Sequence, residues 1–217
     1  MSERFSISGQ HYLFDVQTFA QVVLATGGDE FHYALYDRTT AQVIEDVSSS
    51  LSDVGVIVRT ADTKDVLDQA LNEAGLEFHE LIKSAPCVAL PSSHPMVNAD
   101  SLTLEMMADW PYVYFDQGEG APVEFFEEAL ASIPRAKTIA CTDRASLSEL
   151  IVALNGYTIT SGILVGISDG AFLKTVPLVT DIDLHIGYIC RRGWQPCDLE
   201  KRFIDKLSVN LERYARM

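Results

Sequence analysis

A short and almost continuous apolar run, DVGVIV at 53–58, constrains the fold of this chain more than any other stretch. Runs of this length are typical of strands buried on both faces, which occur in parallel sheets covered by helices. Before it, Phe5 and Ile7 alternate with serines as in a strand, and apolar residues recur at helical spacing from Phe14 to Leu24. A second strand at 31–37 and a helix at 39–52 follow. This β-α-β-α-β order predicts a parallel sheet flanked by helices.

The same alternation continues along the chain and changes only near the end. Helices are predicted at 62–75, 102–109, 123–133, 146–155 and 198–215, and strands at 76–83, 87–91, 112–116, 138–141 and 157–162. Two further runs, 172–178 and 184–191, are predicted to pair with each other. Two α/β units with a returning tail indicate a bilobal protein, with a cleft ringed by loops at the carboxyl ends of its strands.

Charge and composition exclude several classes of function. Acidic residues outnumber basic ones by 31 to 16, which gives a net charge of −15 and argues against direct binding of nucleic acid or anionic lipid. No signal peptide and no apolar run long enough to span a membrane is present, and the four cysteines form no C-x-x-C pair. We therefore expect a cytoplasmic protein without a disulfide framework or a zinc site.

Five stretches carry a resemblance to a known family. They are SDVGVIV at 52–58, ELIKSAPCVALPSSHPM at 80–96, SLTLEMMADWPYVYFD at 101–116, GYTITSGILVGI at 156–167 and TVPLVTDIDLHIGYICRR at 175–192. In this order and spacing, the chain resembles the effector-binding domain of LysR-type transcriptional regulators. The resemblance implies an α/β fold of the type II periplasmic-binding-protein kind, in which two crossover strands join two Rossmann-like lobes around a cleft. Lobe I would comprise 1–84 and 178–217, and lobe II would comprise 85–177.

Members of that family carry an N-terminal winged helix-turn-helix. No segment here is basic or long enough to form one, so we expect no DNA-binding domain in this chain. Any contact with DNA would then require a helix-turn-helix domain that this chain lacks.

Lobe I offers candidate effector contacts where its strands give way to helices. The corner at Gly9 is followed by Gln10, His11 and Tyr12, and a helix N-terminus there would favour an anion. These residues could instead only make the turn and cap the helix. Arg38, Thr39 and Thr40 open the next helix, where a threonine N-cap is the ordinary alternative, and Arg59 could be a plain surface residue.

Lobe II offers the opposite wall of the expected cleft. The candidate effector contacts there are Gln117, Gly118, Glu119, Thr142, Ser161 and Gly162. The glycine-rich loop lacks the spacing of a nucleotide site. Asp143 and Arg144 could simply pair with each other. A tryptophan at Gly9 or Ser161 is expected to block the cleft while leaving the fold intact.

No catalytic residue, metal ligand or cofactor is predicted. His94 lacks the partners of a known catalytic motif and is interpreted as part of a structural turn. Asp181, Asp183 and His185 alternate along a strand and are interpreted as solvent-facing residues. Cys190 and Cys197 could sense oxidants only if a thiol pKa were depressed.

The leading hypothesis is a non-enzymatic sensor of a small molecule, with a carboxylate favoured by the helix N-termini and nearby Arg and His side chains. The resemblance also implies a homodimer or homotetramer. In it, the first helix of one chain would pack against segment 123–133 of its partner. Two alternatives stay open, namely a solute-binding protein of a transporter, which would need a secretion signal, and an enzyme on the same scaffold.

Overall fold

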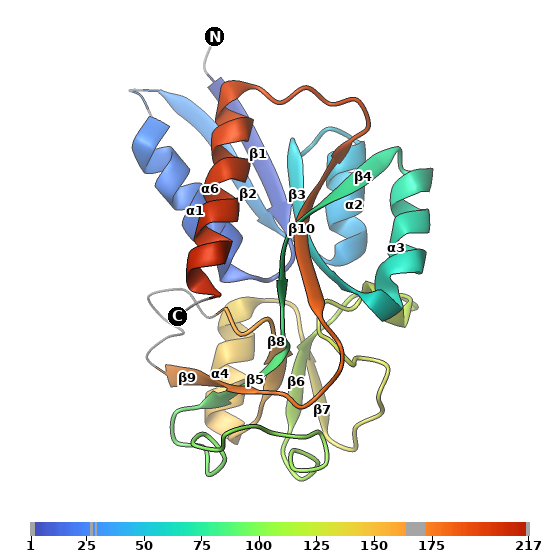
Figure 1. The fold of residues 1–217 in the computed structure, drawn as a ribbon, viewed down its shortest axis with the longest axis vertical. Coiled ribbons are helices and arrows are strands. Elements are labelled where there is room, and N and C mark those ends of the chain that lie inside the picture. Colours follow the sequence, from blue (N-terminus) through green and yellow to red (C-terminus); the bar gives the residue numbers. More distant parts are fainter. Residues whose placement is uncertain (1–2, 27, 29, 164–171, 216–217) are drawn as a thin grey trace.

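The chain folds into two lobes stacked along its long axis (Figure 1). This computed structural model describes residues 3–26, 28, 30–163 and 172–215. Within these ranges, no helix is long and apolar enough to cross a membrane.

Lobe I is built on a five-stranded sheet in the order β2-β1-β3-β10-β4. Its strands are β1 (Glu3–Gly9), β2 (Phe31–Asp37), β3 (Val54–Thr60), β4 (Leu76–Ser84) and β10 (Leu184–Arg191). β1 runs parallel to both β2 and β3, whereas β10 runs antiparallel to β3 and β4. The predicted β-α-β-α-β order at the start of the chain is confirmed.

Helices cover both faces of this sheet. α1 (Leu13–Thr26) and α6 (Asp198–Tyr214) pack together on one face, and α2 (Thr40–Ser48) and α3 (Ala61–Glu73) lie on the other (Figure 1). Val56 and Val58 of β3 belong to the apolar cluster that includes α6, and Ile57 between them belongs to the cluster of α2 and α3. Because its side chains meet helices on both sides, β3 reads as a continuous apolar run.

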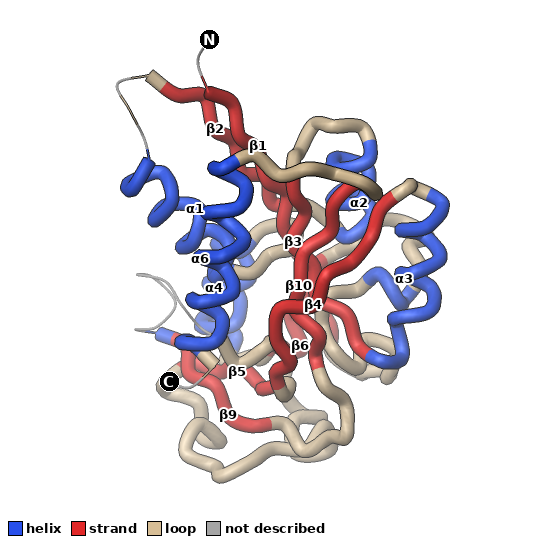
Figure 2. The backbone as a smooth tube through the Cα atoms, turned by 45° about the horizontal axis from the view of Figure 1, so that its top comes forward, coloured by secondary structure: helices blue, strands red, loops and turns tan. Residues whose placement is uncertain are grey.

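Lobe II contains two smaller sheets. β5 (Cys87–Pro91) pairs antiparallel with both β8 (Thr158–Thr160) and β9 (Leu173–Pro177), and β6 (Tyr112–Phe115) pairs parallel with β7 (Thr138–Cys141). A single bridge between Tyr112 and Tyr157 joins the sheets, and α4 (Arg144–Leu154) packs against β5 and β6. Much of the remainder is loop (Figure 2).

The predicted helix at 102–109 is wrong. Leu102 forms a β-bridge with Leu178, and its N–H donates to the Pro177 carbonyl, so its backbone pairs with a distant segment rather than with its own next turn. Turns follow, held by short-range bonds such as Met107 N–H to the Leu104 carbonyl. Leu102 and Met107 are both fully buried, which explains the apolar spacing that favoured a helix.

The predicted helix at 123–133 is also wrong beyond its first turn. Only a 3-10 turn, η1 (Val123–Phe125), forms there. The consecutive side chains Glu127 and Glu128 are both buried, and Leu130 adopts a left-handed φ of 61° that an α-helix does not allow. Instead of the predicted amphipathic helix, this segment forms turns that bury both carboxyl groups.

The runs 172–178 and 184–191 form strands, but the predicted pairing between them is wrong. β9 pairs with β5 in lobe II, whereas β10 enters lobe I and lies between β3 and β4. The chain therefore crosses between the lobes after β4 and again before β10 (Figure 1). The space between the lobes is bounded by these two connections.

Candidate functional site

The corner between β1 and α1 is tied into lobe I by one buried amide side chain. Gln10 accepts a hydrogen bond at Oε1 from Val58 N–H (2.7 Å) and donates from Nε2 to Thr40 Oγ1 (2.5 Å). Both ends of Gln10 are therefore occupied by lobe I. Its role is to hold the corner, β3 and the start of α2 in one arrangement.

Thr40 connects this part of lobe I to lobe II by hydrogen bonds. Its N–H donates to Gln117 Oε1 (2.9 Å), and its hydroxyl donates to the Phe125 carbonyl (2.6 Å). Gln117 is buried, and its Nε2 has no hydrogen-bond partner among the described residues. A buried amide donor left open in this way is costly unless another acceptor reaches it.

His11 meets a carboxylate from the opposite lobe. Glu127 Oε2 lies 3.2 Å from the His11 main-chain N and 3.2 Å from its Nδ1. The His11 ring stacks on Phe115 with centroids 4.0 Å apart. Burial alone would lower the His11 pKa, but the hydrogen bond and charge of Glu127 outweigh it and the pKa is raised. A negatively charged oxygen thus sits where main-chain and imidazole N–H groups converge.

The next residue, Glu128, is a buried carboxyl group whose surroundings disfavour its charged form. Its Oε1 accepts from Phe115 N–H (2.7 Å), and its buried Oε2 has no partner within the described chain. Burial, followed by the charge of Glu127, raises the Glu128 pKa well above its ordinary value. Burial thus favours the protonated form of Glu128, which can donate a hydrogen bond.

Arg144, at the start of α4, forms a second bridge between the lobes. It donates to the Tyr12 carbonyl (2.9 Å) and pairs with Asp37 at 2.6 Å. The hydroxyl of Tyr12 in turn donates to the Glu127 carbonyl (3.0 Å). The sequence left open a pair between Asp143 and Arg144, but Asp143 instead caps α4 by accepting from Ser146 N–H.

Glu127 and Glu128 line two small cavities between the lobes. One, of about 60 Å³, lies among residues of both lobes that include His11, Phe115 and Arg144. The other, of about 110 Å³, is lined by Arg59, Thr60 and Leu184 among others. Ligand pockets are usually several hundred Å³ in volume, so neither of these two cavities admits a metabolite as it stands. A larger and more open hollow of about 660 Å³ lies beside them, lined by Leu13 and Asp37 of lobe I and by Arg144 and Leu173 of lobe II among others.

Gly9 lies directly against the buried side chain of Asp15. A Cβ at Gly9 would overlap the Asp15 carboxylate, and the Gly9 carbonyl also accepts from Arg38 N–H. The expectation that Gly9→Trp leaves the fold intact is therefore wrong. Asp15 has no partner for Oδ2 among the described residues, and burial raises its pKa to about 8.

The other lobe I candidates are engaged elsewhere. Arg38 pairs with Asp46 (2.9 Å), and Thr39 is the N-cap of α2, as one of the two interpretations allowed. Arg59 pairs with Asp68 and lies over the Phe78 ring at 3.8 Å, although it also lines the larger cavity. Their charges are balanced within lobe I.

The remaining lobe II candidates lie away from the contact between His11 and Glu127. Gly118, Glu119 and Thr142 are exposed. Ser161 is buried, and its carbonyl accepts from Ser84 at the end of β4, while a Cβ at Gly162 would overlap Cys87. Of the predicted residues, the structure thus groups Gln10, His11, Tyr12, Thr40 and Gln117 around the contact at His11, while Ser161 bonds to lobe I at the crossover after β4.

Several residues that complete this contact were not predicted from the sequence. They are Asp37, Phe115, Phe125, Glu127, Glu128 and Arg144. The available signal was the pair of adjacent glutamates inside the apolar stretch VEFFEEALASI, although the same pattern also fits the polar side of an amphipathic helix.

His94 and Cys190 match their structural interpretation. His94 is buried, and its Nδ1 accepts from Met96 N–H within a turn, as predicted. Burial raises the pKa of the Cys87 thiol, and raises that of Cys141 and Cys190 to about 11. These three thiols are therefore protonated at neutral pH, which does not favour oxidant sensing by them.

The architecture defines a class before any sequence comparison. Two α/β lobes joined by two crossings, with charged and polar side chains meeting between them, are the fold of a type II periplasmic-binding-protein-like domain. The family model described as LysR substrate binding domain matches residues 30–209. The chain belongs to this family, whose members are regulatory rather than catalytic. A search of curated proteins finds no match.

Solved structures share the fold at low identity. The effector-binding domain of QuiR in complex with shikimate is 16% identical, with a TM-score of 0.64 over 98% of this chain and 99% of that one. HinK, a LysR family regulator from Pseudomonas aeruginosa, is 13% identical, with a TM-score of 0.65 over 97% and 71%. An H2O2-bound mutant of Corynebacterium glutamicum OxyR is 13% identical, with a TM-score of 0.64 over 99% and 70%.

Proposed function

We propose that this domain senses a small carboxylate that binds between the lobes of a LysR-type transcriptional regulator. The observation that carries the proposal is the position of Glu127, whose carboxylate meets the N–H and Nδ1 of His11 at 3.2 Å each. A carboxylate of the chain itself occupies the one corner that the helix N-terminus and the raised His11 pKa make suitable for an anion.

In this proposal the effector takes the place of the Glu127 carboxylate. The cavities beside it, of about 60 and 110 Å³, are too small for a metabolite. Binding at His11 therefore requires that Glu127 leave His11. The hollow of about 660 Å³ that shares Leu13, Arg144 and Leu173 with the smaller cavity offers further room beside it. Gln117 Nε2 offers a further donor, and Glu128 Oε2 offers another when it is protonated, since both atoms are buried without a partner in the described chain.

An effector would change the arrangement of the two lobes by breaking hydrogen bonds between them. Tyr12 of lobe I bonds to Glu127 and Arg144 of lobe II. Thr40 bonds to Gln117 and to the Phe125 carbonyl, and Asp37 pairs with Arg144. A ligand shifts such an equilibrium only by its difference in affinity for the two arrangements. A carboxylate that replaces Glu127 binds only the arrangement in which the contact between Glu127 and His11 is broken, so its affinity differs between the two arrangements.

The signal would pass to DNA through an oligomer. We propose a homodimer, or a tetramer made from it, in which α1 packs against segment 123–133 of the partner. Leu24 on α1 is 87% exposed, and Val123 and Ile133 are each about two fifths exposed. Leu24→Glu is expected to weaken dimerisation in light scattering after size exclusion. Val66→Glu on α3 is the matched control.

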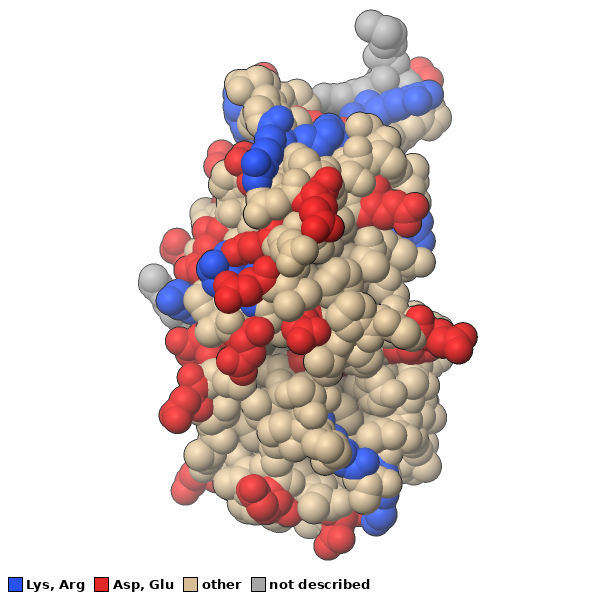
Figure 3. Space-filling model, turned by 90° about the vertical axis from the view of Figure 1, so that its right-hand side faces the viewer, with Lys and Arg blue, Asp and Glu red and all other residues tan. Residues whose placement is uncertain are grey.

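DNA contact is assigned to a helix-turn-helix domain of the regulator and not to this one. Figure 3 shows a face on which acidic side chains outnumber basic ones, in line with the net charge of −15. Such a surface repels phosphates. Action on DNA would place the protein in the cytoplasm, and family membership favours a regulator over a transporter's solute-binding protein.

A thermal-shift screen of small carboxylates and their neutral amides tests this function. A specific carboxylate is expected to raise the unfolding temperature, and its amide is not. The proposal fails if the carboxylates that bind do so equally well to a His11→Ala variant that is shown to be folded by circular dichroism.

A further inference from the structure

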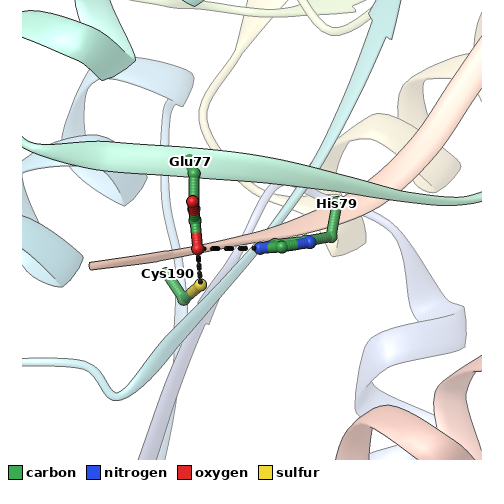
Figure 4. A group of neighbouring side chains, drawn as sticks. All are labelled: Glu77, His79 and Cys190. Carbon is green, nitrogen blue, oxygen red and sulfur yellow. Dashed lines mark hydrogen bonds and ion pairs between the residues drawn. The ribbon is translucent and has the colours of Figure 1, made fainter. Parts of the chain in front are cut away.

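Three potential metal ligands meet at the edge of the lobe I sheet. The side chains of Glu77 and His79 on β4 point toward Cys190 on β10 (Figure 4). Within the described chain, these are three His, Cys, Asp or Glu side chains whose ligand atoms all lie within 4.8 Å of one another. They lie toward the end of β4 opposite to its connection with lobe II, so they are separate from the contact at His11.

The sheet register holds these three groups together. Glu77 and His79 are two residues apart on one strand and therefore share a face. Cys190 lies directly opposite Glu77 on the antiparallel neighbour, and Tyr188 lies opposite His79. The Tyr188 ring stacks on the imidazole with centroids 4.8 Å apart, which fixes the plane of the His79 ring. The donors are thus placed by rigid backbone rather than by a loop.

The distances suit a tetrahedral cation. His79 Nε2 lies 3.2 Å from Glu77 Oε1, and Cys190 Sγ lies 3.9 Å from the same oxygen. Bonds of about 2.0 Å to nitrogen and oxygen and about 2.3 Å to sulfur place tetrahedral donors roughly 3.3–3.5 Å apart. Cys190 Sγ and His79 Nε2 lie within 4.8 Å of each other, so side-chain rotations that move these atoms by about an ångström bring all three donors to one ion.

We propose that Glu77, His79 and Cys190 bind a zinc-like divalent cation in lobe I. A thiolate, an imidazole and a carboxylate are the donor set that zinc and cobalt prefer, whereas magnesium and calcium take oxygen donors. Cys190 is 2% exposed, while the Glu77 and His79 side chains are 45% and 42% exposed. The sulfur therefore anchors the ion from inside, and solvent supplies the fourth ligand.

Binding exchanges one proton for one metal–sulfur bond. The Cys190 S–H releases its proton to solvent, and the thiolate donates its electron pair to the cation. His79 Nε2 and Glu77 Oε1 exchange their contact with each other for bonds to the ion. No oxidant or reductant is required.

Cobalt binding to the reduced, metal-free chain tests this site directly. Co²⁺ is expected to bind one per chain and to produce the near-ultraviolet charge-transfer band of a cobalt–thiolate bond. His79→Gln and Glu77→Gln are expected to weaken binding at least about tenfold, and Cys190→Ser to remove the band. Zn²⁺ is expected to displace Co²⁺ and abolish the absorption.

The chain supplies matched controls. His185 and Glu80 form a second His–carboxylate pair on the same two strands, at 2.5 Å. His185→Gln, Cys87→Ser and Cys197→Ser are expected to leave the cobalt spectrum unchanged. The exposed variants at 77 and 79 keep the test valid if the buried Cys190→Ser does not fold.

Two results would overturn the site. One is a chain with no charge-transfer band and no Zn²⁺ binding in calorimetry. The other is a band that survives both His79→Gln and Glu77→Gln, or that disappears in Cys197→Ser, because the thiolate would then belong to another site.

Discussion

Replacing Glu127 with glutamine is the most informative change at the contact between the lobes. The substitution keeps the shape of the side chain and removes its charge beside His11. Hydrogen bonds to a charged group contribute about 1.5–3 kcal/mol, and neutral ones about 0.5–1.5 kcal/mol. An effector that must displace residue 127 therefore has about 1–1.5 kcal/mol less to overcome, which is roughly a 5- to 12-fold gain in affinity.

Calorimetric titration with the carboxylate that raises the unfolding temperature measures this gain. Glu124→Gln is the matched control, because Glu124 is three residues away and only half-buried. It is expected to leave the dissociation constant unchanged. Weaker binding by Glu127→Gln, or an affinity equal to that of the unmodified chain, would refute competition between Glu127 and the effector.

Three further predictions concern the same corner. Asp15 has a pKa of about 8 in the folded chain against an ordinary value of 3.8, so its contribution to stability is complete below pH 3.8 and is lost as pH rises toward 8. The free energy of unfolding of Asp15→Asn, relative to that of the unmodified chain, should therefore rise by about 1.4 kcal/mol per pH unit between pH 5 and 8. Urea unfolding in which the two chains differ by the same amount at every pH would contradict this. Arg144→Gln removes the bonds to Tyr12 and Asp37, so small-angle scattering should show a larger radius of gyration, whereas an unchanged radius would argue against this bridge. Gly9→Ala should cost about 1–3 kcal/mol, because its Cβ overlaps the Asp15 carboxylate, and an unaltered urea midpoint would count against that clash.

The helices and strands of lobe I were predicted well from short sequence patterns, because each of them is determined by residues within the element itself. The run 53–58 is apolar since β3 touches helices on both faces, and Thr39 caps α2 as an ordinary N-cap. The amphipathic face of α6 likewise reflects a single buried stripe through Phe203, Leu207 and Leu211. In each case the residues that define the element also form its main contacts.

Lobe II and the contact between lobes depend on partners distant in sequence. Leu102 pairs with Leu178, and Glu127 reaches His11 across 116 positions. A partner so distant in sequence produces no periodic pattern around the residue it contacts. Helical spacing was therefore the strongest local pattern in both segments, and the helices predicted from it were wrong. The pairing of β9 and β10 with different sheets follows the same rule, since adjacency in sequence favoured a hairpin that the lobes do not form.

The candidate residues divide along the same line. His11 and Tyr12 were predicted mainly because the family resemblance implies effector contacts at this corner, and a helix start beside a glycine supports an anion site there. Glu127 and Glu128 were not, since a glutamate pair in an apolar stretch ordinarily marks the polar side of a helix. Only the fold shows that both carboxyl groups turn inward.

The central claim is that a small carboxylate binds at His11 in place of Glu127, and nuclear magnetic resonance of the histidine tests it most directly. During titration with the carboxylate selected by thermal shift, the main-chain amide and imidazole signals of His11 should move together and saturate at the dissociation constant measured by calorimetry. Saturable binding with unmoved His11 signals would contradict the claim.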